Sequence, residues 1–374
     1  MANKIMSIEQ ITQITENPEE LYTGSQYILP EQSGDEVAKA VNFKISLGEV
    51  QQRPVQVIDF DDVVDQANER NHKALSQGCL EIILRDVQDA PHTYFYSHNP
   101  ESAERLQKLP NVFISRTSIG ETSAHKVFFA LLTSEDDKLR VAVKPFVSGD
   151  IAQKTITDWS NTLLARKSGL ETFEPLGFMI CNGVGYTVTE RQDDIDSMDN
   201  VDWSRVLMSP DNDSMLNDIL KTGPALARLN HMGIFHGDPQ MKNGVLTQRG
   251  SMHWIDWEAS TIINRSLVQK SPKTESLIHE KTVRDLLVLF NSLARSVNDN
   301  GVGLLDGKTP LAQYQSFDEL VLTPYVNERL KLIDNGDTSK INAILTELGA
   351  VEQDISDYIK RGILHDNLKR SRHN

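Results

Sequence analysis

The sequence is short of the residues that build disulfide frameworks, zinc sites and membrane spans. Only two cysteines occur among 374 residues, Cys79 and Cys181, and their wide spacing fits neither a disulfide framework nor a metal site. A charge-free apolar stretch, residues 175–189, is too short to cross a bilayer and contains three glycines, so it predicts a β-hairpin instead. Residues 1–30 carry four glutamates where a secretory signal has a basic start and an apolar block. These absences predict a cytoplasmic protein without a membrane span.

Positive charge is also scarce. Lysine and arginine number 38 against 53 aspartates and glutamates, which gives a net charge of -15 and a pI near 5.1. Such a charge opposes binding to nucleic acid or to an anionic membrane, and the basic tail at residues 369–372 is too short to reverse it. The hydrophobic fraction of 39% and the charged fraction of 24% indicate a globular chain that buries a sizeable core in two or three domains.

Oxygen-bearing side chains recur at a characteristic spacing in the second half of the chain. Asp238 is followed five residues later by Asn243, and Asp256 ends a separate apolar run. In Mg-dependent phosphoryl transfer one carboxylate orients the attacking hydroxyl, while an amide oxygen and a second carboxylate hold the metal. The order and spacing therefore favour a phosphoryl-transfer site. The alternative is a simple turn, in which Asp238 caps local amides and Pro239 stiffens the bend.

The run His236-Gly237-Asp238 with Asn243, followed by Ile255-Asp256-Trp257-Glu258, resembles the aminoglycoside phosphotransferase and choline kinase-like branch of the protein-kinase-like superfamily. Residues 225–234 look like the Leu-His-x-x-Gly-Ile run that precedes the loop in that branch. The resemblance implies an α+β, bilobal protein-kinase-like fold, with a β-rich small lobe that has one main helix and a helical large lobe. It also implies ATP and Mg²⁺ as cofactors.

On this resemblance the chain divides into three parts. Residues 1–110 form an α+β extension of unknown role, residues 111–192 a kinase-like small lobe, and residues 193–374 a kinase-like large lobe. Within the extension, a helix is expected from Asp61 onward, with Asp61 or Asp62 at its start.

The small lobe is expected to supply the nucleotide-binding residues. Three strands are expected at residues 113–115, 126–130 and 141–144, and the last, Val-Ala-Val-Lys, resembles the strand whose lysine contacts nucleotide phosphates. Asp158 lies on an expected amphipathic helix, where kinases carry the acidic partner of that lysine; it is alternatively a solvated carboxylate at a helix start. The expected phosphate-covering loop is poor in glycine. Its candidate residues are Gly120, Thr122 and Ser123, and the hinge candidates, carried over by position, run from Thr189 through Glu190 and Arg191 to Gln192.

The resemblance assigns roles in the large lobe as well. Asp238 is the expected catalytic base, and Asn243 and Asp256 are the expected magnesium ligands. His236 is expected to pack the loop. Lys242 either reaches the γ-phosphate or faces solvent, and Glu258 either assists a second metal or substrate or is a surface residue at a strand end.

Two large-lobe helices are expected around this loop. One spans residues 215–232 with an interruption near Gly223-Pro224. The other spans residues 278–297 and has an apolar stripe that marks it as core. Asp285 on the second helix is interpreted as a structural or an exposed carboxylate.

These motifs predict a kinase that transfers the γ-phosphate of ATP to a hydroxyl of a small molecule. One alternative is a HipA-like or atypical serine/threonine kinase, for which the substrate is a protein. Another is a nucleotide-binding scaffold without turnover. A phosphatase of the haloacid dehalogenase type, with Asp59 as nucleophile in Asp59-Phe60-Asp61, is the weakest interpretation because the residues that follow depart from that pattern.

Overall fold

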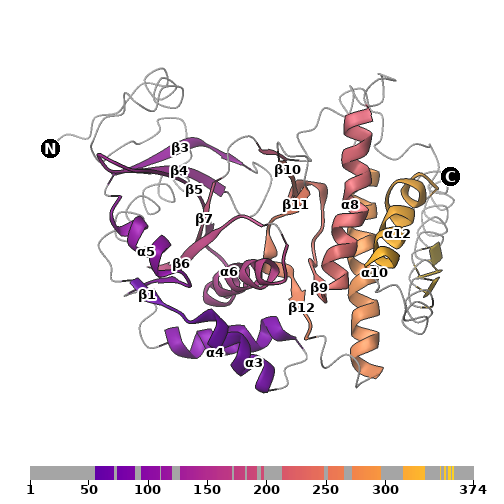
Figure 1. Ribbon diagram of the computed structural model, residues 1–374, viewed down its shortest axis with the longest axis horizontal. Coiled ribbons are helices and arrows are strands. Elements are labelled where there is room, and N and C mark those ends of the chain that lie inside the picture. The colour runs from indigo at the N-terminus through magenta and orange to yellow at the C-terminus, as the bar shows by residue number, and fades with distance from the viewer. Residues whose placement is uncertain are drawn as a thin grey trace, which may run out of the picture. The chain divides into compact units, whose positions relative to one another are not determined.

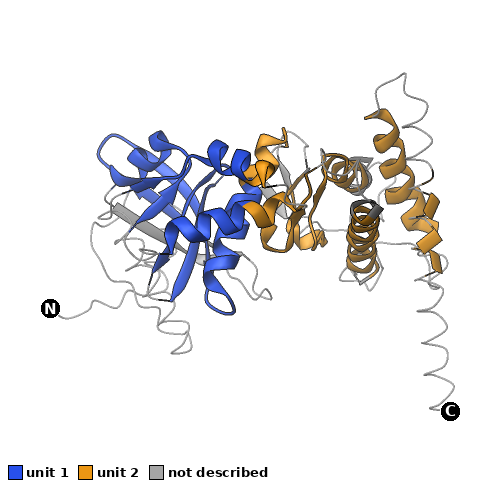
Figure 2. Cartoon of the chain, turned by 90° about the horizontal axis from the view of Figure 1, so that it is seen from below, with its two compact units in different colours: residues 1–66, 79–162, 173–192 blue, residues 67–78, 163–172, 193–374 orange. Residues whose placement is uncertain are grey.

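The structure is a computed structural model, and the chain divides into two compact units (Figure 2). Unit 1 comprises residues 1–66, 79–162 and 173–192, and unit 2 comprises residues 67–78, 163–172 and 193–374. The structure describes residues 55–70, 74–88, 94–109, 111–119, 127–170, 172–181, 183–191, 195–197, 213–247, 252–264, 272–295 and 315–332, with isolated positions at 346, 349–350, 353–354 and 356–357.

Unit 1 is built on a seven-stranded sheet with the order β1-β2-β6-β7-β5-β4-β3 (Figure 1). The strands are β1 (Val55–Val57), β2 (Phe95–Ser97), β3 (Asn111–Ile119), β4 (Val127–Thr133), β5 (Lys138–Phe146), β6 (Pro175–Cys181) and β7 (Val184–Glu190). β1 and β2 pair in parallel, whereas the other neighbouring strands pair antiparallel. Inward-facing residues such as Phe95, Val141 and Val188 form its core.

Among the described residues, four helices precede or separate these strands along the chain. They are α3 (Phe60–Glu69), α4 (Leu75–Val87), α5 (Pro100–Gln107) and α6 (Ile151–Lys167). The start of α5 follows from its sequence, because the Asn99 side chain accepts hydrogen bonds from the amides of Glu101 and Ser102 while Pro100 occupies the first helical position.

The start of α3 differs from the prediction. The helix begins at Phe60, and the cap is Asp59, whose Oδ1 accepts a hydrogen bond of 3.1 Å from the amide of Asp62. The prediction of Asp61 or Asp62 as the starting cap was wrong, since both lie inside the first turn. An aspartate at the N-cap satisfies an otherwise unpaired helix amide. This role accounts for Asp59 without any catalytic chemistry.

Strands of the predicted extension belong to the same sheet as those of the predicted small lobe. β2 pairs with β6 through Tyr96 and Phe178, and the Ser97 hydroxyl donates to the carbonyl of Leu176 at 2.7 Å. Trp159 of α6 packs against Phe60 at 5.6 Å and against Phe178 at 4.9 Å between ring centroids. Strand β2 and Phe60 at the start of α3 therefore belong to the same scaffold as Trp159 of α6.

Unit 2 combines helices with two small sheets. Its helices are α8 (Asp213–His231), α10 (Pro272–Arg295), the π-helix η4 (Asp318–Leu322) and α12 (Thr323–Lys331). The three-stranded sheet has the order β11-β10-β8, from β8 (Ile195–Ser197), β10 (Gly244–Thr247) and β11 (Met252–Trp254), and the two-stranded sheet pairs β9 (Ile234–Phe235) with β12 (Thr261–Ile262). Two 3₁₀ turns are described in this unit. η2 (Met241–Asn243) ends at Asn243, and η3 (Trp257–Ala259) follows Asp256.

Helix α8 runs through Pro224 without the predicted interruption. A proline inside a helix removes one backbone hydrogen bond and disfavours the helix at that point, which is why the sequence predicted an interruption. In the structure, packing against other elements keeps α8 continuous at this point. A Cβ at Gly223 would lie 2.3 Å from the carbonyl oxygen of Val321, so the glycine lets the backbone of η4 approach α8 closely. Packing of α12 and η4 on α8 offsets the cost of the proline.

The α+β class predicted from the sequence is confirmed. The antiparallel part of the large sheet has the expected chain order, with three strands (β3, β4, β5), then helix α6, then the β6–β7 hairpin. This is the order of elements expected for a kinase-like small lobe. In the part of the chain that the structure describes, no helix has the length and apolar character that crossing a membrane requires.

We expect Trp159→Ala to lower the free energy of unfolding by about 3–5 kcal/mol, because loss of this fully buried aromatic side chain leaves a cavity among Phe60, His98 and Phe178. Trp159→Phe is the control. The indole Nε1 makes no hydrogen bond to the described residues, so this variant loses only part of the apolar contact. Urea unfolding followed by circular dichroism measures both, and equal losses in the two variants would contradict the packing argument.

Candidate active site

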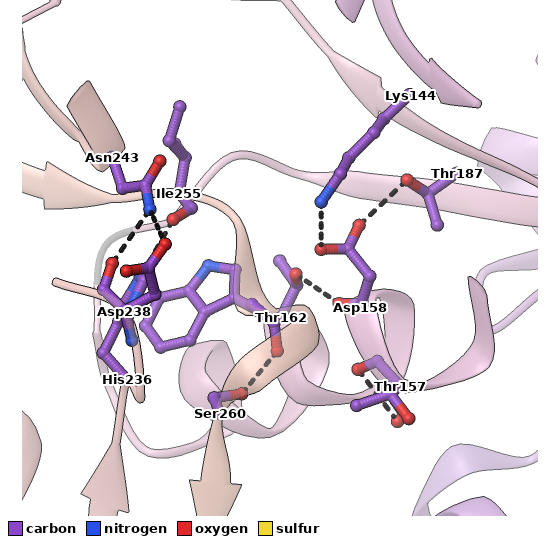
Figure 3. Close-up of polar contacts among 12 residues, drawn as sticks. Lys144, Thr157, Asp158, Thr162, Thr187, His236, Asp238, Asn243, Ile255 and Ser260 are labelled. Atoms are coloured by element: carbon purple, nitrogen blue, oxygen red, sulfur yellow. Dashed lines mark hydrogen bonds and ion pairs between the residues drawn. The ribbon is translucent and has the colours of Figure 1, made fainter. Parts of the chain in front are cut away.

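The Asp238 carboxylate is held in one orientation by two amide side chains. Gln240 Nε2 donates to Asp238 Oδ1 at 2.6 Å. Asn243 Nδ2 donates to Asp238 Oδ2 at 3.1 Å, as Figure 3 shows. Asn243 Nδ2 also donates to the Asp238 carbonyl at 2.8 Å. These bonds span the turn between β9 and η2, so the loop is closed by its own side chains.

The same contacts fix the amide of Asn243. Its partners on Asp238 are both acceptors, so the atom that faces them is the nitrogen. The amide oxygen therefore points away from Asp238, as Figure 3 shows. Asn243 is 5% exposed, and its backbone carbonyl accepts a hydrogen bond from the backbone amide of Ile255 at 2.8 Å. A buried, oriented amide oxygen is the type of ligand that a hard cation uses.

Asp256 lies immediately after this contact, at the same end of the β10–β11 hairpin. The hairpin pairs Gly244 with Trp254, and the bond from Ile255 to Asn243 continues that register by one residue. Asp256 has φ 69° and ψ 67°, and it is the one non-glycine residue with positive φ in the described part of the chain. Such a conformation costs on the order of 1 kcal/mol or more and is concentrated at functional sites.

His236 is completely buried and braces the loop against the hairpin. Its Nδ1 accepts from the amide of Asp238 at 3.3 Å, so Nε2 carries the proton and donates to the carbonyl of Ile255 at 2.9 Å. The ring packs against Trp254 and Trp257, with centroid distances of 5.4 and 5.0 Å. Both ring nitrogens are thus engaged in holding the loop.

Gly237 is required by its conformation and by its surroundings. Its φ is +81°, which side-chain-bearing residues rarely adopt. A Cβ at this position would also lie 2.2 Å from the carbonyl oxygen of Ala259. The glycine therefore allows the loop to pass close to the η3 turn that follows Asp256.

Asp285 of α10 anchors the loop through its carboxylate, whereas the sequence left it as either a structural or an exposed residue and did not link it to the loop. Its Oδ1 accepts from the amide of Gly237 at 2.8 Å, and its Oδ2 accepts from the amide of His236 at 2.9 Å and from Asn230 Nδ2 at 3.4 Å. The side chain is fully buried, so it is the structural carboxylate of the two interpretations. The signal in the sequence was a charged residue on the apolar face beside Leu286 and Leu289.

Burial raises the pKa of the Asp285 carboxyl from 3.8 to about 6, while the bonds from Gly237, His236 and Asn230 and the charge of Arg284 act in the opposite direction. Removal of the carboxylate from water disfavours its charged form, and bonds to the charged form favour it. The loop anchor is thus a buried charge that its hydrogen-bond donors compensate in part.

The lysine and the acidic residue of unit 1 form the expected pair. Lys144 Nζ lies 3.3 Å from Asp158 Oδ1, and the two side chains are 12% and 10% exposed. The Thr187 hydroxyl donates to Asp158 Oδ2 at 2.9 Å, and Thr187 is the cross-strand partner of Lys144 between β5 and β7. Figure 3 shows both contacts of the carboxylate. The alternative that Asp158 is a solvated residue at a helix start is wrong, because it is buried in the middle of α6.

The other predicted nucleotide-binding residues are placed in part. Gly120, Thr122, Ser123 and Gln192 lie outside the described residues. Thr189 and Glu190 end β7 and Arg191 follows it; the amide of Glu190 donates to Glu174 at 2.8 Å and that of Arg191 to Arg140 at 2.9 Å. These two hinge candidates therefore have their backbone amides bonded within the sheet.

Lys242 and Glu258, the remaining predicted residues, lie in η2 and η3 and are half-buried. Unit 2 thus gathers Asp238, Asn243 and Asp256 on one loop and hairpin, and unit 1 pairs Lys144 with Asp158. No cluster of three or more histidine, cysteine or acidic residues suited to a metal occurs among the described residues. The expected magnesium ligands differ from such a cluster because they combine one carboxylate with one amide.

We expect the free energy of unfolding to contain a pH-dependent contribution from Asp285. The folded state binds its proton more tightly than the unfolded chain, so this contribution is present below pH 4 and is lost as the pH rises through about 6. Its size is about 3 kcal/mol at most. The excess stability of the wild type over Asp285→Asn should fall over that interval in chemical denaturation, and a constant difference would contradict the prediction.

The sequence matches no protein-family profile and no curated protein. Among the solved structures similar to the chain is "WaaP in complex with acyl carrier protein", with a TM-score of 0.35 and 13% sequence identity. That alignment covers 62% of this chain and 86% of the other. A likeness of this size says nothing about the function of this chain.

Proposed function

We propose that the protein is an ATP- and Mg-dependent phosphotransferase that moves the γ-phosphate to a hydroxyl of a small molecule. The hydrogen bond between Asn243 Nδ2 and Asp238 Oδ2 carries the proposal. It orients a carboxylate and turns the amide oxygen of Asn243 away from it. Asp256, in a strained conformation, follows Ile255, whose amide donates to the backbone carbonyl of Asn243. A plain turn requires neither the buried amide nor the strained aspartate.

The donor set suits magnesium. Mg²⁺ takes oxygen ligands and is usually held by one or two protein carboxylates, with phosphate oxygens and water in the remaining positions. Asp256 and the amide oxygen of Asn243 are oxygen donors at one end of the hairpin. When bound, the metal neutralises charge on the phosphates during transfer.

Asp238 is assigned as the base. Its carboxylate accepts a hydrogen bond from the acceptor hydroxyl, orients that oxygen toward the γ-phosphorus and takes its proton as the new oxygen–phosphorus bond forms. The bond between the γ-phosphorus and the β–γ bridging oxygen breaks in the same transfer, and ADP leaves. Gln240 and Asn243 keep the carboxylate from rotating, which lowers the cost of reaching the productive geometry. His236 supports the loop and does not transfer protons, because both ring nitrogens are engaged.

Lys144 is assigned to the nucleotide phosphates. Its ammonium is paired with Asp158, and the hydroxyl of Thr187 holds the other oxygen of that carboxylate. A lysine restrained by a buried partner presents its charge in a defined direction, which a freely rotating surface lysine does not. The loop residues Gly120, Thr122 and Ser123 and the hinge residues Thr189, Glu190 and Arg191 complete the proposed nucleotide site.

We expect Asp238→Asn to lower kcat by about 10²–10⁴-fold, because general-base catalysis contributes a factor of that order. The nucleotide Kd should stay near the wild-type value, since Asp238 is not assigned to the nucleotide. The matched control is Asp86→Asn, the same change at an exposed helical position. Steady-state ATP turnover with Mg²⁺ and a panel of hydroxyl acceptors measures kcat, and wild-type turnover by Asp238→Asn would contradict the assignment.

We expect Asp256→Ala to abolish the effect of Mg²⁺ on nucleotide affinity, while binding without the metal changes little. Calorimetric titration of ATP with and without Mg²⁺ measures this.

The same preparations of wild-type protein and variants also distinguish the alternative functions. Labelling of protein without an added acceptor would favour a protein kinase, and tight ATP binding without turnover in the wild type would favour a scaffold.

A further inference from the structure

A buried chain of hydrogen bonds joins α12 to residues 236–243, which contain the proposed base Asp238 and are called the catalytic loop below. Arg329 Nη1 donates to the Tyr325 hydroxyl at 3.3 Å, and that hydroxyl donates to Asn230 Oδ1 at 3.0 Å. Asn230 Nδ2 donates to Asp285 Oδ2 at 3.4 Å, and Asp285 accepts the amides of His236 and Gly237. All members belong to unit 2, and they come from α12, α8 and α10.

The chemistry of the two ends fixes the direction of every bond. Arginine has only donors, and an ionised carboxylate has only acceptors. The Tyr325 hydroxyl therefore accepts a hydrogen bond from Arg329 and donates one to the side-chain oxygen of Asn230. This contact turns the Asn230 amide nitrogen toward Asp285 and toward the carbonyl of Ile234, which lies 3.1 Å away.

Burial makes each of these bonds consequential. Tyr325, Asn230 and Asp285 are fully buried, and Arg329 is 3% exposed. A buried polar group that loses its partner cannot recover the bond from bulk water. Removal of the Tyr325 hydroxyl would leave the Asn230 oxygen without this donor, so the amide would lose a contact that distinguishes its two orientations.

We propose that Tyr325 and Arg329 are positioning residues for the catalytic loop, acting through the Asn230 amide and the Asp285 carboxylate on the backbone of His236 and Gly237. Asp238 follows that backbone directly, so a shift in the anchored amides moves the base. The link to catalysis rests on the proposed function. The link between α12 and the loop does not.

A second contact between the same two helices provides the control. Arg228 of α8 lies 2.9 Å from Glu328 of α12, and the Arg228 side chain is 43% exposed. This ion pair also joins α8 to α12, but it contacts neither Asn230 nor Tyr325. Arg228→Gln therefore weakens the helix pair while the buried chain stays intact.

The test compares Tyr325→Phe with Arg228→Gln. Tyr325→Phe keeps the ring and its packing, and we expect the amides of His236 and Gly237 to exchange with solvent about tenfold faster, relative to a reference peptide from α6. In steady-state kinetics kcat should fall about tenfold with little change in KM, because the base is displaced and not the nucleotide. The acid limb of the profile of kcat against pH should move to higher pH, because the Asp285 carboxylate loses the well-oriented hydrogen bond from the Asn230 amide.

Arg228→Gln should leave both measurements near wild type. Unchanged exchange and kinetics in Tyr325→Phe would overturn the proposal, and so would equal changes in Arg228→Gln, which would assign the effect to helix packing. If the wild type shows no turnover but exchange in Tyr325→Phe rises as expected, the buried chain is supported and the proposed function fails. Arg329→Lys retains a donor and a charge, and it should fall between the wild type and Tyr325→Phe in exchange rate.

Discussion

The Asp285 carboxylate is the contact on which the arrangement of the loop depends. It accepts the amides of two successive residues, His236 and Gly237, and those residues carry the chain into Asp238. Gly237 needs its left-handed conformation to present that amide while it passes beside Ala259. Without an acceptor inside α10, these two buried amides would lose their partners, and the loop would have no fixed orientation.

That contact carries an energetic cost which the surrounding residues reduce. An ionised carboxylate out of water is unfavourable, and for Asp285 this appears as a raised pKa. The Asn230 amide and the chain behind it from α12 supply polar support in the buried interior. The buried carboxylate thus lowers the stability of the fold at neutral pH while it bonds the two loop amides.

Strands β1 and β2, which precede residue 110, belong to the same sheet as β5 and β7. The pair of Lys144 and Asp158 is therefore supported by segments that lie before residue 110 in the sequence and by segments that lie after it. Asp158 is fixed on one side by Thr187 of β7. The next residue, Trp159, packs against Phe60 from the segment that the sequence left without a role. Phe60 therefore helps to position Trp159, and with it the neighbouring carboxylate that holds the lysine.

The sequence alone determined the features that depend on short stretches: the Asp238 to Asn243 spacing, the β6–β7 hairpin, and the helix that carries Asp158 after β5. Their signals lie in residue spacing and apolar periodicity, which are local. Tertiary structure decided the rest. Asp285 contacts Gly237 across 48 residues, and α8 continues through Pro224 because η4 packs against Gly223. Neither outcome is encoded in a local window, because both depend on which buried surfaces meet when the chain folds.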